Sequence, residues 1–323
     1  MLHQIPSLGF GTFQVDLQAD PQQAAKDVTL NALKTGYRHI DTAFAYGNGR
    51  VERGVGQAIQ ESGISRSEIF LVSKLHNTFH EPDAVGLGLE RTLTNLQVAY
   101  VDLYLMHNPF AYSHNERYET LRKEDGSNKP VIDLEMSRRY PDTWKAMYEL
   151  LATGKVKHIG VSNFNILKLQ RLMGETGIVP TANQVEFNPY FPQKKLLSFC
   201  QAHGIQLVAH SPLGGAPAPA VVGRESNGPL QDPYVNTLAQ KYKCTAAQVI
   251  LSWILARGAC AVPKSKNIDR MIENRNCHIP LEVLEVEQMS NLVGRNEEYA
   301  VRNLQPKDHI GFNIYDEELD QPV

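Results

Sequence analysis

The sequence lacks the features expected of a membrane protein, a secreted protein or a nucleic-acid-binding protein. No run approaches the roughly 18 consecutive apolar residues of a membrane-spanning helix, and the start, MLHQIPSLGFGTF, does not show the basic and then apolar layout of a signal peptide. A formal net charge of −3 over 323 residues gives no general attraction for nucleic acid or anionic lipid. We therefore expect a cytoplasmic protein, monomeric or weakly homo-oligomeric, whose partner is a small molecule.

Cysteine is scarce and is not arranged for disulfides or for a thiolate metal site. The four cysteines are far apart and form no C-x-x-C pair. His76 and His80 have a spacing that a helix could use for a metal, but they begin at a strand end without a nearby third ligand. No metal site is predicted. The cysteines, which we interpret as buried or idle thiols, are Cys200, Cys244, Cys260 and Cys277.

Short runs rich in β-branched and aromatic residues alternate with longer amphipathic segments, such as residues 83–96 and 142–154. A chain of 323 residues has room for two ordinary domains. Eight alternations of strand and helix favour instead a single (β/α)8 barrel, an α/β fold, over residues 1–323. The predicted parallel strands are residues 7–13, 37–43, 69–75, 101–107, 157–163, 181–187, 205–212 and 259–265.

Three stretches depart from this alternation. Residues 110–139 are long and charged and follow a strand end, where barrel enzymes place their lids, although an interdomain linker is the alternative. Residues 214–230 are rich in Gly, Ala and Pro, which suits either a mobile loop or a passive connector. The tail, residues 295–323, is polar and has no clear periodicity. We expect it to form a third loop over the barrel.

Four polar residues fall near the ends of successive predicted strands. Asp41 and Lys74 lie near the ends of the second and third strands, His107 ends the fourth, and Tyr46 follows Asp41 on a loop. Alone, Asp41 could be a turn cap, and Tyr46 and His107 could be structural residues. A lysine within an apolar strand is costly unless it is paired, and Asp41 is the available partner. Because barrel active sites lie at the carboxyl ends of the strands, the four together predict a catalytic site.

The charges of these residues indicate a mechanism. A tyrosine hydroxyl has a pKa of about 10, and a neighbouring lysine ammonium lowers that value by favouring the phenolate. When hydride reaches a carbonyl carbon, negative charge grows on the oxygen. Tyr46 and His107 could hydrogen-bond that oxygen while Tyr46 gives up its proton. Asp41 would keep Lys74 charged and oriented.

The segments DTAFAYGN, LVSKLHNTFHEP, VDLYLMHNP, GKVKHIGVSNF and VPKSKNIDRMIEN resemble the aldo-keto reductase family, and the resemblance runs from about Gly9 to Asn276. It implies that the family's catalytic tetrad consists here of Asp41, Tyr46, Lys74 and His107, with Tyr46 as the general acid. The implied reaction is the NADPH-dependent reduction of an aldehyde or ketone to an alcohol. The alternatives are an NADP+-dependent alcohol or polyol dehydrogenase and a low-turnover nucleotide-binding barrel with a structural or regulatory role.

The sequence has no dinucleotide fingerprint, because Gly9 and Gly11 lack a third glycine in register. The basic segment at 264–270, where the eighth strand becomes a helix, is the alternative phosphate site, and a merely solvated helix start is the competing interpretation. By resemblance, Lys264, Ser265 and Arg270 hold the adenosine 2′-phosphate, and Glu273 and Asn274 bind the adenine. The resemblance also implies that Ser162, Asn163 and Gln184 hold the carboxamide of nicotinamide, and that Ser211 and Leu213 touch the pyrophosphate. The residues expected at NADPH or NADP+ are Gly11, Thr12, Asp41, Ser162, Asn163, Gln184, His210, Ser211, Leu213, Lys264, Ser265, Lys266, Asn267, Arg270, Glu273 and Asn274.

Several positions depart from the family. Phe13, His76 and Asn108 stand where many relatives have tryptophans that line the substrate pocket. With Tyr46 and His107 they would contact the substrate, and two of the changes add hydrogen-bonding groups, so we expect a polar carbonyl compound such as a sugar, a sugar acid or a dicarbonyl. His210 replaces the usual tyrosine that stacks on the nicotinamide, and an imidazole offers less stacking area.

Overall fold

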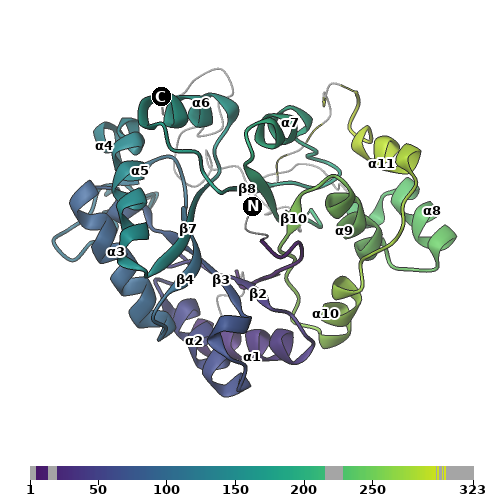
Figure 1. Ribbon diagram of the computed structural model, residues 1–323, viewed down its shortest axis with the longest axis horizontal. Coiled ribbons are helices and arrows are strands. Elements are labelled where there is room, and N and C mark those ends of the chain that lie inside the picture. Colours follow the sequence, from purple (N-terminus) through teal and green to yellow (C-terminus); the bar gives the residue numbers. More distant parts are fainter. Residues whose placement is uncertain are drawn as a thin grey trace.

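The computed structural model describes residues 5–13, 20–214 and 228–295, together with Glu297, Ala300 and Arg302. In these residues eight strands form one parallel sheet whose spatial order follows the chain. Figure 1 shows the sheet curling into a ring with the helices outside it. The strands are β1 (Phe10–Gly11), β2 (His39–Asp41), β3 (Phe70–Leu75), β4 (Val101–Met106), β7 (Val156–Ser162), β8 (Ala182–Glu186), β9 (Gln206–His210) and β10 (Cys260–Ala261).

Backbone hydrogen bonds between the first and last strands close the ring. Leu8 forms a parallel bridge with Ala261. The Gly9 N–H donates to the Ala261 carbonyl at 2.8 Å, and the Gly11 N–H donates to the Pro263 carbonyl at 3.0 Å. A closed sheet has no free edge, which removes the unpaired N–H and C=O groups that an open sheet exposes. The predicted (β/α)8 barrel is confirmed.

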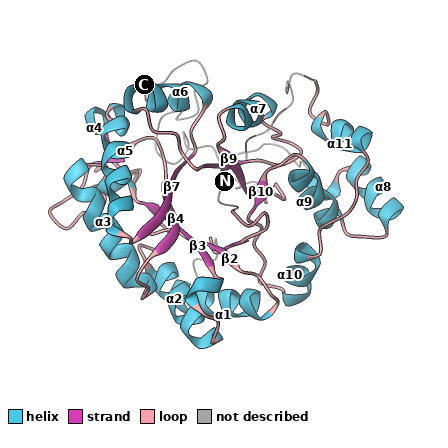
Figure 2. Ribbon diagram, in the orientation of Figure 1, coloured by secondary structure: helices cyan, strands magenta, loops and turns pink. Residues whose placement is uncertain are grey.

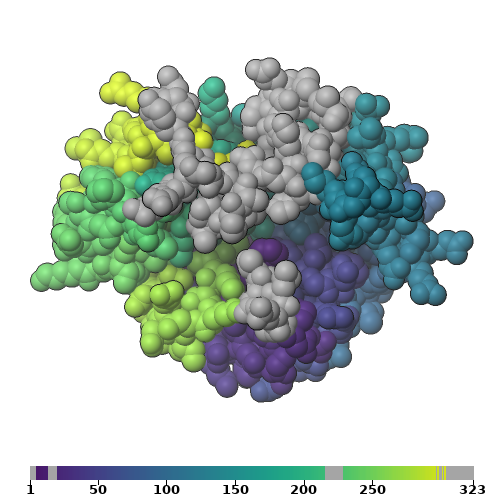
Figure 3. All heavy atoms as spheres, turned by 180° about the vertical axis from the view of Figure 1, so that it is seen from behind, coloured from purple at the N-terminus to yellow at the C-terminus, as the bar shows by residue number. Residues whose placement is uncertain are grey.

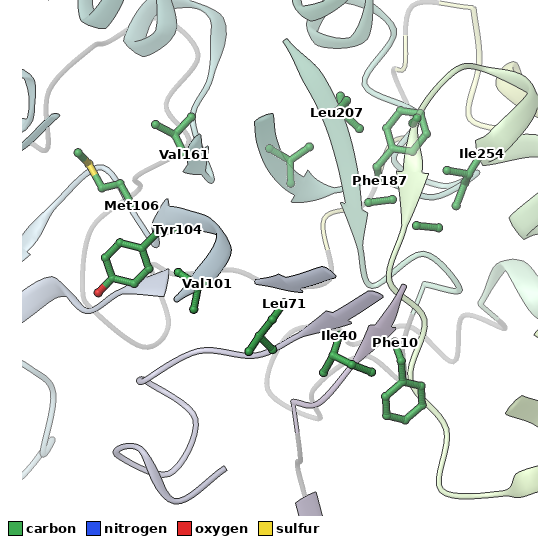
Figure 4. Packing of buried hydrophobic residues seen from close by; sticks show 14 of the residues in the cluster. Phe10, Ile40, Leu71, Val101, Tyr104, Met106, Val161, Phe187, Leu207 and Ile254 are labelled. Carbon is green, nitrogen blue, oxygen red and sulfur yellow. The ribbon is translucent and has the colours of Figure 1, made fainter. Parts of the chain in front are cut away.

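Side chains alternate along each strand between the inside of the barrel and the helices. On β3, Leu71 belongs to the large outer core and Val72 to a small cluster inside the barrel. Figure 4 shows Leu71 and Ile40 pointing away from the barrel axis. Because the alternation has a period of two, Lys74 shares the inner face with Val72, and Asp41 points the other way from Ile40. The strand pattern thus directs both polar side chains into the barrel.

Helices surround the sheet (Figure 2). They pack closely where glycine allows it: a Cβ at Gly54 or Gly56 of α2 would overlap the carbonyl oxygens of Gln22 and Leu96 on its two neighbouring helices. The helices are α1 (Pro21–Lys34), α2 (Arg50–Ser62), α3 (Pro82–Leu96), α4 (Leu134–Arg138), α5 (Tyr140–Glu149), α6 (Ile166–Thr176), α7 (Lys194–Ala202), α8 (Pro233–Tyr242), α9 (Ala246–Ala256), α10 (Ile268–Arg275) and α11 (Val283–Ser290), with 3-10 turns at Arg66–Glu68, Asn77–Phe79, Leu150–Thr153 and Pro229–Gln231.

The charged stretch 110–139, expected to be a loop, contains a β-hairpin. β5 (Ala111–Tyr112) pairs antiparallel with β6 (Ile132–Asp133), and bridges join His114 to Thr120 and Arg122 to Pro130. We call residues 111–133 the hairpin. It follows β4 and, in Figure 3, lies in blue-teal at the right of the face opposite to that of Figure 1. Of the other two expected loops, residues 215–227 and nearly all of 295–323 lie outside the described residues.

The cysteines are as the sequence predicts. Cys200, Cys260 and Cys277 are buried, Cys244 is half-buried, and all four are free thiols. Burial also raises the pKa of each thiol above its ordinary value, which keeps it protonated and unreactive. Among the helices that the structure describes, none combines the length and the apolar character needed to cross a membrane.

Candidate active site

Asp41 and Lys74 form a buried ion pair at the mouth of the barrel, the face at the carboxyl ends of the strands. Lys74 Nζ lies 2.7 Å from Asp41 Oδ1, and the two side chains are 1% and 4% exposed. Asp41 ends β2, and Lys74 is the next-to-last residue of β3. An ammonium group this deeply buried would be very costly without a partner, so the carboxylate is what allows a lysine in an apolar strand.

The Lys74 ammonium uses all three of its hydrogens. Besides Asp41, it donates to the Thr42 carbonyl oxygen at 2.8 Å and to the Tyr46 hydroxyl oxygen at 3.4 Å. Burial lowers the pKa of Lys74, but the negative charge of Asp41 and the hydrogen bonds outweigh burial, and the net pKa is above its ordinary value. Lys74 therefore remains a fixed positive charge beside Tyr46.

Tyr46 differs from the expectation in the direction of its pKa. Burial raises the pKa of Tyr46 above its ordinary value, and the positive charge of Lys74 opposes this increase without overcoming it. The predicted net decrease in the pKa of Tyr46 is therefore wrong. Removing the phenolate from water destabilises it by more than the positive charge of Lys74 stabilises it. Lys74 does act in the predicted direction. The result is a Tyr46 hydroxyl that keeps its proton at neutral pH.

His107 lies against Tyr46 and is neutral. The two ring centroids are 5.9 Å apart in an edge-to-face arrangement. Burial lowers the pKa of His107 well below its ordinary value, and Lys74 adds to the decrease. Its Nδ1 atom is buried and makes no hydrogen bond to the described residues. A neutral imidazole has one N–H donor and one acceptor, so His107 can hydrogen-bond a ligand without adding a charge.

Gln184 and Thr12 fix Asp41 from its other sides. Gln184 Nε2 donates to Asp41 Oδ2 at 2.7 Å, so both carboxylate oxygens are occupied. The Thr12 hydroxyl donates to the Asp41 carbonyl at 3.0 Å. Gln184 was expected only at the cofactor carboxamide, and its bond to Asp41 was missed. The alternation of β8 could have revealed it, since Gln184 and Asp41 both occupy inward positions.

Ser162, Asn163 and His210 form a second polar cluster beside the tetrad. Asn163 has a positive φ of 64°, which turns its side chain back toward the preceding strands. Its Nδ2 donates to the His107 carbonyl and to Asn108 Oδ1, each at 3.0 Å. His210 Nε2 lies 3.3 Å from Asn163 Oδ1, and burial lowers the pKa of His210 to about 3. The cluster therefore links three strand ends without carrying a net charge.

The basic segment after β10 forms a helix start. Asn267 caps α10 by accepting a hydrogen bond from the Arg270 N–H at 2.9 Å, and Ser265 Oγ accepts one from the Asn267 N–H at 3.1 Å. Arg270 is exposed, whereas Asn274 is buried. Helix N-termini attract anions, so the position suits a phosphate. Most of the other predicted cofactor residues lie at strand ends along the same face: Gly11 ends β1 and Thr12 follows it, Ser211 and Leu213 follow β9, and Lys264 and Lys266 follow β10. Glu273 lies on α10.

Two of the predicted substrate residues, Phe13 and His107, contact Tyr46, and His76 lies at the end of β3. The Phe13 ring centroid lies 5.0 Å from that of Tyr46, and Phe13 is 52% exposed. His76 Nδ1 accepts a hydrogen bond from the Thr78 N–H at 3.3 Å, which leaves the ring proton on Nε2. Burial lowers the pKa of His76 to about 4, so this histidine is a neutral donor. In the part of the chain that is described, no three metal-binding side chains cluster around it.

The fold and the site together define a class, a closed (β/α)8 barrel with a buried Asp–Lys pair, a tyrosine and a histidine at its mouth. Residues 7–293 match the model of the aldo/keto reductase family. The chain is 42% identical to glycerol 2-dehydrogenase (NADP(+)) of Saccharomyces cerevisiae, over 84% of this chain and 82% of that protein. It is 39% identical to aldo-keto reductase family 1 member A1 of Xenopus tropicalis, over 84% and 80%.

Solved structures give the same result. The aldose reductase of Giardia lamblia superposes with a TM-score of 0.82 at 30% identity, and the match covers 98% of this chain and all of that one. The aldose reductase of Schistosoma japonicum has a TM-score of 0.81 at 31% identity, covering 98% and 97%. The chain belongs to the aldo/keto reductase family. It is accordingly an NADP-dependent oxidoreductase.

Proposed function

We propose that this protein reduces an aldehyde or ketone to an alcohol, with Tyr46 as the proton donor. The observation that carries the proposal is the Lys74 ammonium, which touches both the Asp41 carboxylate and the Tyr46 hydroxyl in a buried site. When bound, NADPH supplies the hydride that reaches the carbonyl carbon. A carbonyl oxygen that accepts hydrogen bonds from Tyr46 and His107 would be held where its negative charge develops.

Each member of the tetrad has a role that follows from its charge. Tyr46 holds its proton before the reaction and gives it to the oxygen as the hydride arrives. Lys74 stabilises the phenolate that is left, and Asp41 keeps Lys74 charged and in place. His107 is neutral, so it orients the carbonyl without competing as an acid. We further propose that residues 1–323 form one catalytic domain, since the described strands make a single barrel and one small hairpin sheet.

The first experiment is to follow NADPH absorbance with a panel of aldehydes, α-dicarbonyls, aldoses and uronic acids. We expect oxidation of NADPH with at least one class of compound. Phe13, His76 and Asn108 give the pocket fewer aromatic walls and more hydrogen-bonding groups, so polar compounds should have higher kcat/KM than bulky aromatic ketones. If no carbonyl compound consumed NADPH, the proposed function would be wrong.

The reverse reaction is the second candidate. The relative named glycerol 2-dehydrogenase (NADP(+)) has a name that describes alcohol oxidation. The same Tyr46 could accept a proton from an alcohol when NADP+ is bound, by microscopic reversibility. Measuring both directions at matched cofactor concentrations separates the two. A third possibility, a nucleotide-binding barrel with little turnover, is less favoured because all four tetrad residues are brought together at one face.

The residues after β10 fit NADPH in preference to NADH. Arg270 is exposed on the first turn of α10, and Ser265 and Lys264 precede it. Changing Arg270 to alanine should raise the Kd for NADPH about ten- to hundredfold, since a charge-assisted hydrogen bond contributes about 1.5–3 kcal/mol. The Kd for NADH, which has no 2′-phosphate, should hardly change. Both are measured by quenching of protein fluorescence, with Arg275→Ala on the same helix as the control. Equal losses for the two cofactors would contradict the assignment.

His210 should limit how tightly the nicotinamide is held. Its imidazole is half-buried and neutral, beside Asn163. Changing His210 to tyrosine should lower the Kd for NADPH by about two- to tenfold, the range expected from the stacking energy of aromatic pairs. The measurement is a fluorescence titration, and His203→Tyr on the exposed end of α7 is the matched control. Weaker NADPH binding in His210→Tyr would show that His210 does not take the stacking position.

A further inference from the structure

A cavity of about 460 Å³ lies between the barrel mouth and the hairpin. Its volume is in the range of small-molecule sites, about 300–1,000 Å³. His76 and Asn108 line it from the ends of β3 and β4. Asn108 is tied to Asn163, which also bonds the His107 carbonyl, so this wall of the cavity is continuous with the tetrad. A molecule with its carbonyl at Tyr46 can therefore extend toward the hairpin.

The opposite wall is supplied by the hairpin, through Tyr112, Arg122, Asn128 and Lys129. Within the hairpin, residues 121–123 are joined to residues 129–131 by backbone bonds from Lys123 N–H to the Lys129 carbonyl at 2.8 Å and from Val131 N–H to the Leu121 carbonyl at 2.9 Å. Arg122 Nη1 donates to the Asn128 carbonyl at 2.8 Å, which braces the guanidinium across the hairpin. The hairpin thus carries two cationic side chains that border the same cavity.

The charge along this wall is one-sided. None of the described residues that line the cavity is an aspartate or a glutamate. Neither Arg122 nor Lys129 forms an ion pair with a carboxylate in the described part of the chain. The guanidinium has five N–H donors, and the bond to Asn128 uses only one of them. Two cations that share a cavity without a counter-charge repel each other, and an anionic ligand relieves that repulsion.

Tyr112 adds a neutral donor to this wall. Burial raises the pKa of Tyr112 to about 12, although the charge of Arg122 opposes the increase. The hydroxyl therefore keeps its proton at neutral pH. The His76 ring centroid lies 5.9 Å from that of Tyr112, so the barrel side and the hairpin side of the cavity meet here. His76 is neutral with its proton on Nε2, which makes it a second uncharged donor.

We propose that Arg122 and Lys129 bind an anionic group, carboxylate or phosphate, at the end of the substrate away from its carbonyl. The substrate class would then be small anionic aldehydes or ketones. This inference rests on the proposed carbonyl reduction, and it assigns to the hairpin a specificity that none of the tetrad residues provides. Arg122 would form the directional hydrogen bonds because its planar fork matches an oxyanion, and Lys129 would add a point charge.

The test compares matched pairs of aldehydes that differ only in the anionic group: 4-carboxybenzaldehyde with benzaldehyde, and glyceraldehyde 3-phosphate with glyceraldehyde. In Arg122→Gln we expect kcat/KM for the favoured anionic member to fall about ten- to hundredfold, the equivalent of one charged hydrogen bond. For the neutral member it should change by less than about twofold, because no such bond is lost. Lys129→Gln should lower kcat/KM for the anionic member in the same way. In the unmodified protein, the pair with the larger ratio of anionic to neutral kcat/KM shows whether carboxylate or phosphate is the preferred group.

Lys123→Gln is the matched control. Lys123 is exposed and directly follows Arg122 on the extended segment that pairs with residues 129–131. Neighbouring residues of an extended segment point to opposite sides, and Lys123 is absent from the cavity wall among the described residues. The ratio of kcat/KM for anionic and neutral aldehydes in Lys123→Gln should equal that of the unmodified protein. Equal losses for charged and neutral aldehydes in Arg122→Gln would show that Arg122 only braces the hairpin, which would overturn the inference.

A binding measurement separates this inference from the proposed function. Calorimetric titration with 4-(hydroxymethyl)benzoate and with benzyl alcohol, in the presence of NADPH, measures binding without turnover, because an alcohol and the reduced cofactor cannot react with each other. We expect the anion to bind more tightly, and the difference to shrink in Arg122→Gln and at high salt. Turnover of neutral aldehydes with no anion preference in rate or binding would refute the inference and leave the reductase function intact. Preferential binding of the anion without turnover of any aldehyde would support the anion site and refute the reductase function.

Discussion

Changing Tyr46 to phenylalanine should lower kcat/KM for carbonyl reduction by about 10²- to 10⁴-fold, the usual contribution of a positioned general acid. The variant loses only the hydroxyl oxygen that lies 3.4 Å from Lys74 Nζ. The ring that packs against Phe13 and His107 is retained, so the barrel mouth should keep its shape. The rate is measured from NADPH absorbance under saturating cofactor.

Two measurements make this result specific. The Kd for NADPH should stay within about twofold, because a phenolic acid contributes to the transition state more than to cofactor binding. Tyr104→Phe is the matched control, since Tyr104 is buried on β4 and points away from the barrel axis (Figure 4). It should keep its activity. Unchanged activity in Tyr46→Phe would remove the proposed acid and most of the mechanism.

Changing Lys74 to methionine should lower the free energy of unfolding by about 3–5 kcal/mol, the usual cost of leaving one member of a buried ion pair without its partner. The Asp41 carboxylate would keep its hydrogen bond from Gln184 but lose the ammonium 2.7 Å away. Catalysis should fall as well, because the phenolate of Tyr46 would have no adjacent positive charge. Urea denaturation measures the first effect and NADPH oxidation the second.

The double variant Asp41→Asn/Lys74→Met distinguishes stability from catalysis. With both charges removed, no buried ion is left unpaired, so most of the lost free energy of unfolding should return. Activity should stay low, since the charge beside Tyr46 is still missing. If the double variant were as unstable as Lys74→Met, the unpaired Asp41 carboxylate would not be the cause of the lost free energy of unfolding.

The order of the strands along the sequence was sufficient to bring Asp41, Lys74 and His107 to one face, because parallel strands bring their carboxyl ends to one side. Asp41 and Lys74 fall on neighbouring strands. Their pairing then followed from the cost of a buried ammonium. What could not be predicted depends on burial in three dimensions. The net pKa of Tyr46 is one example, because the desolvation that raises it comes from residues distant in the sequence.

The hairpin is the other part that sequence reasoning missed. Residues 110–139 are long and charged and follow a strand end, so they were expected to be a lid loop, with an interdomain linker as the alternative. Their short strands β5 and β6 are held mainly by backbone hydrogen bonds, which leave little trace in side-chain pattern. Arg122 and Lys129 consequently looked like two of many surface charges. Only the fold shows that they border a cavity continuous with the tetrad.

The saturated hydrogen bonding of Lys74 also protects the protein from its own substrates. An aldehyde forms an imine with a lysine whose nitrogen has a free lone pair. The nitrogen of Lys74 stays protonated, and its hydrogens are directed at the oxygens of Asp41, Thr42 and Tyr46. It therefore has no nucleophilic electron pair to offer. The barrel can hold a reactive carbonyl group beside a lysine without forming a covalent adduct.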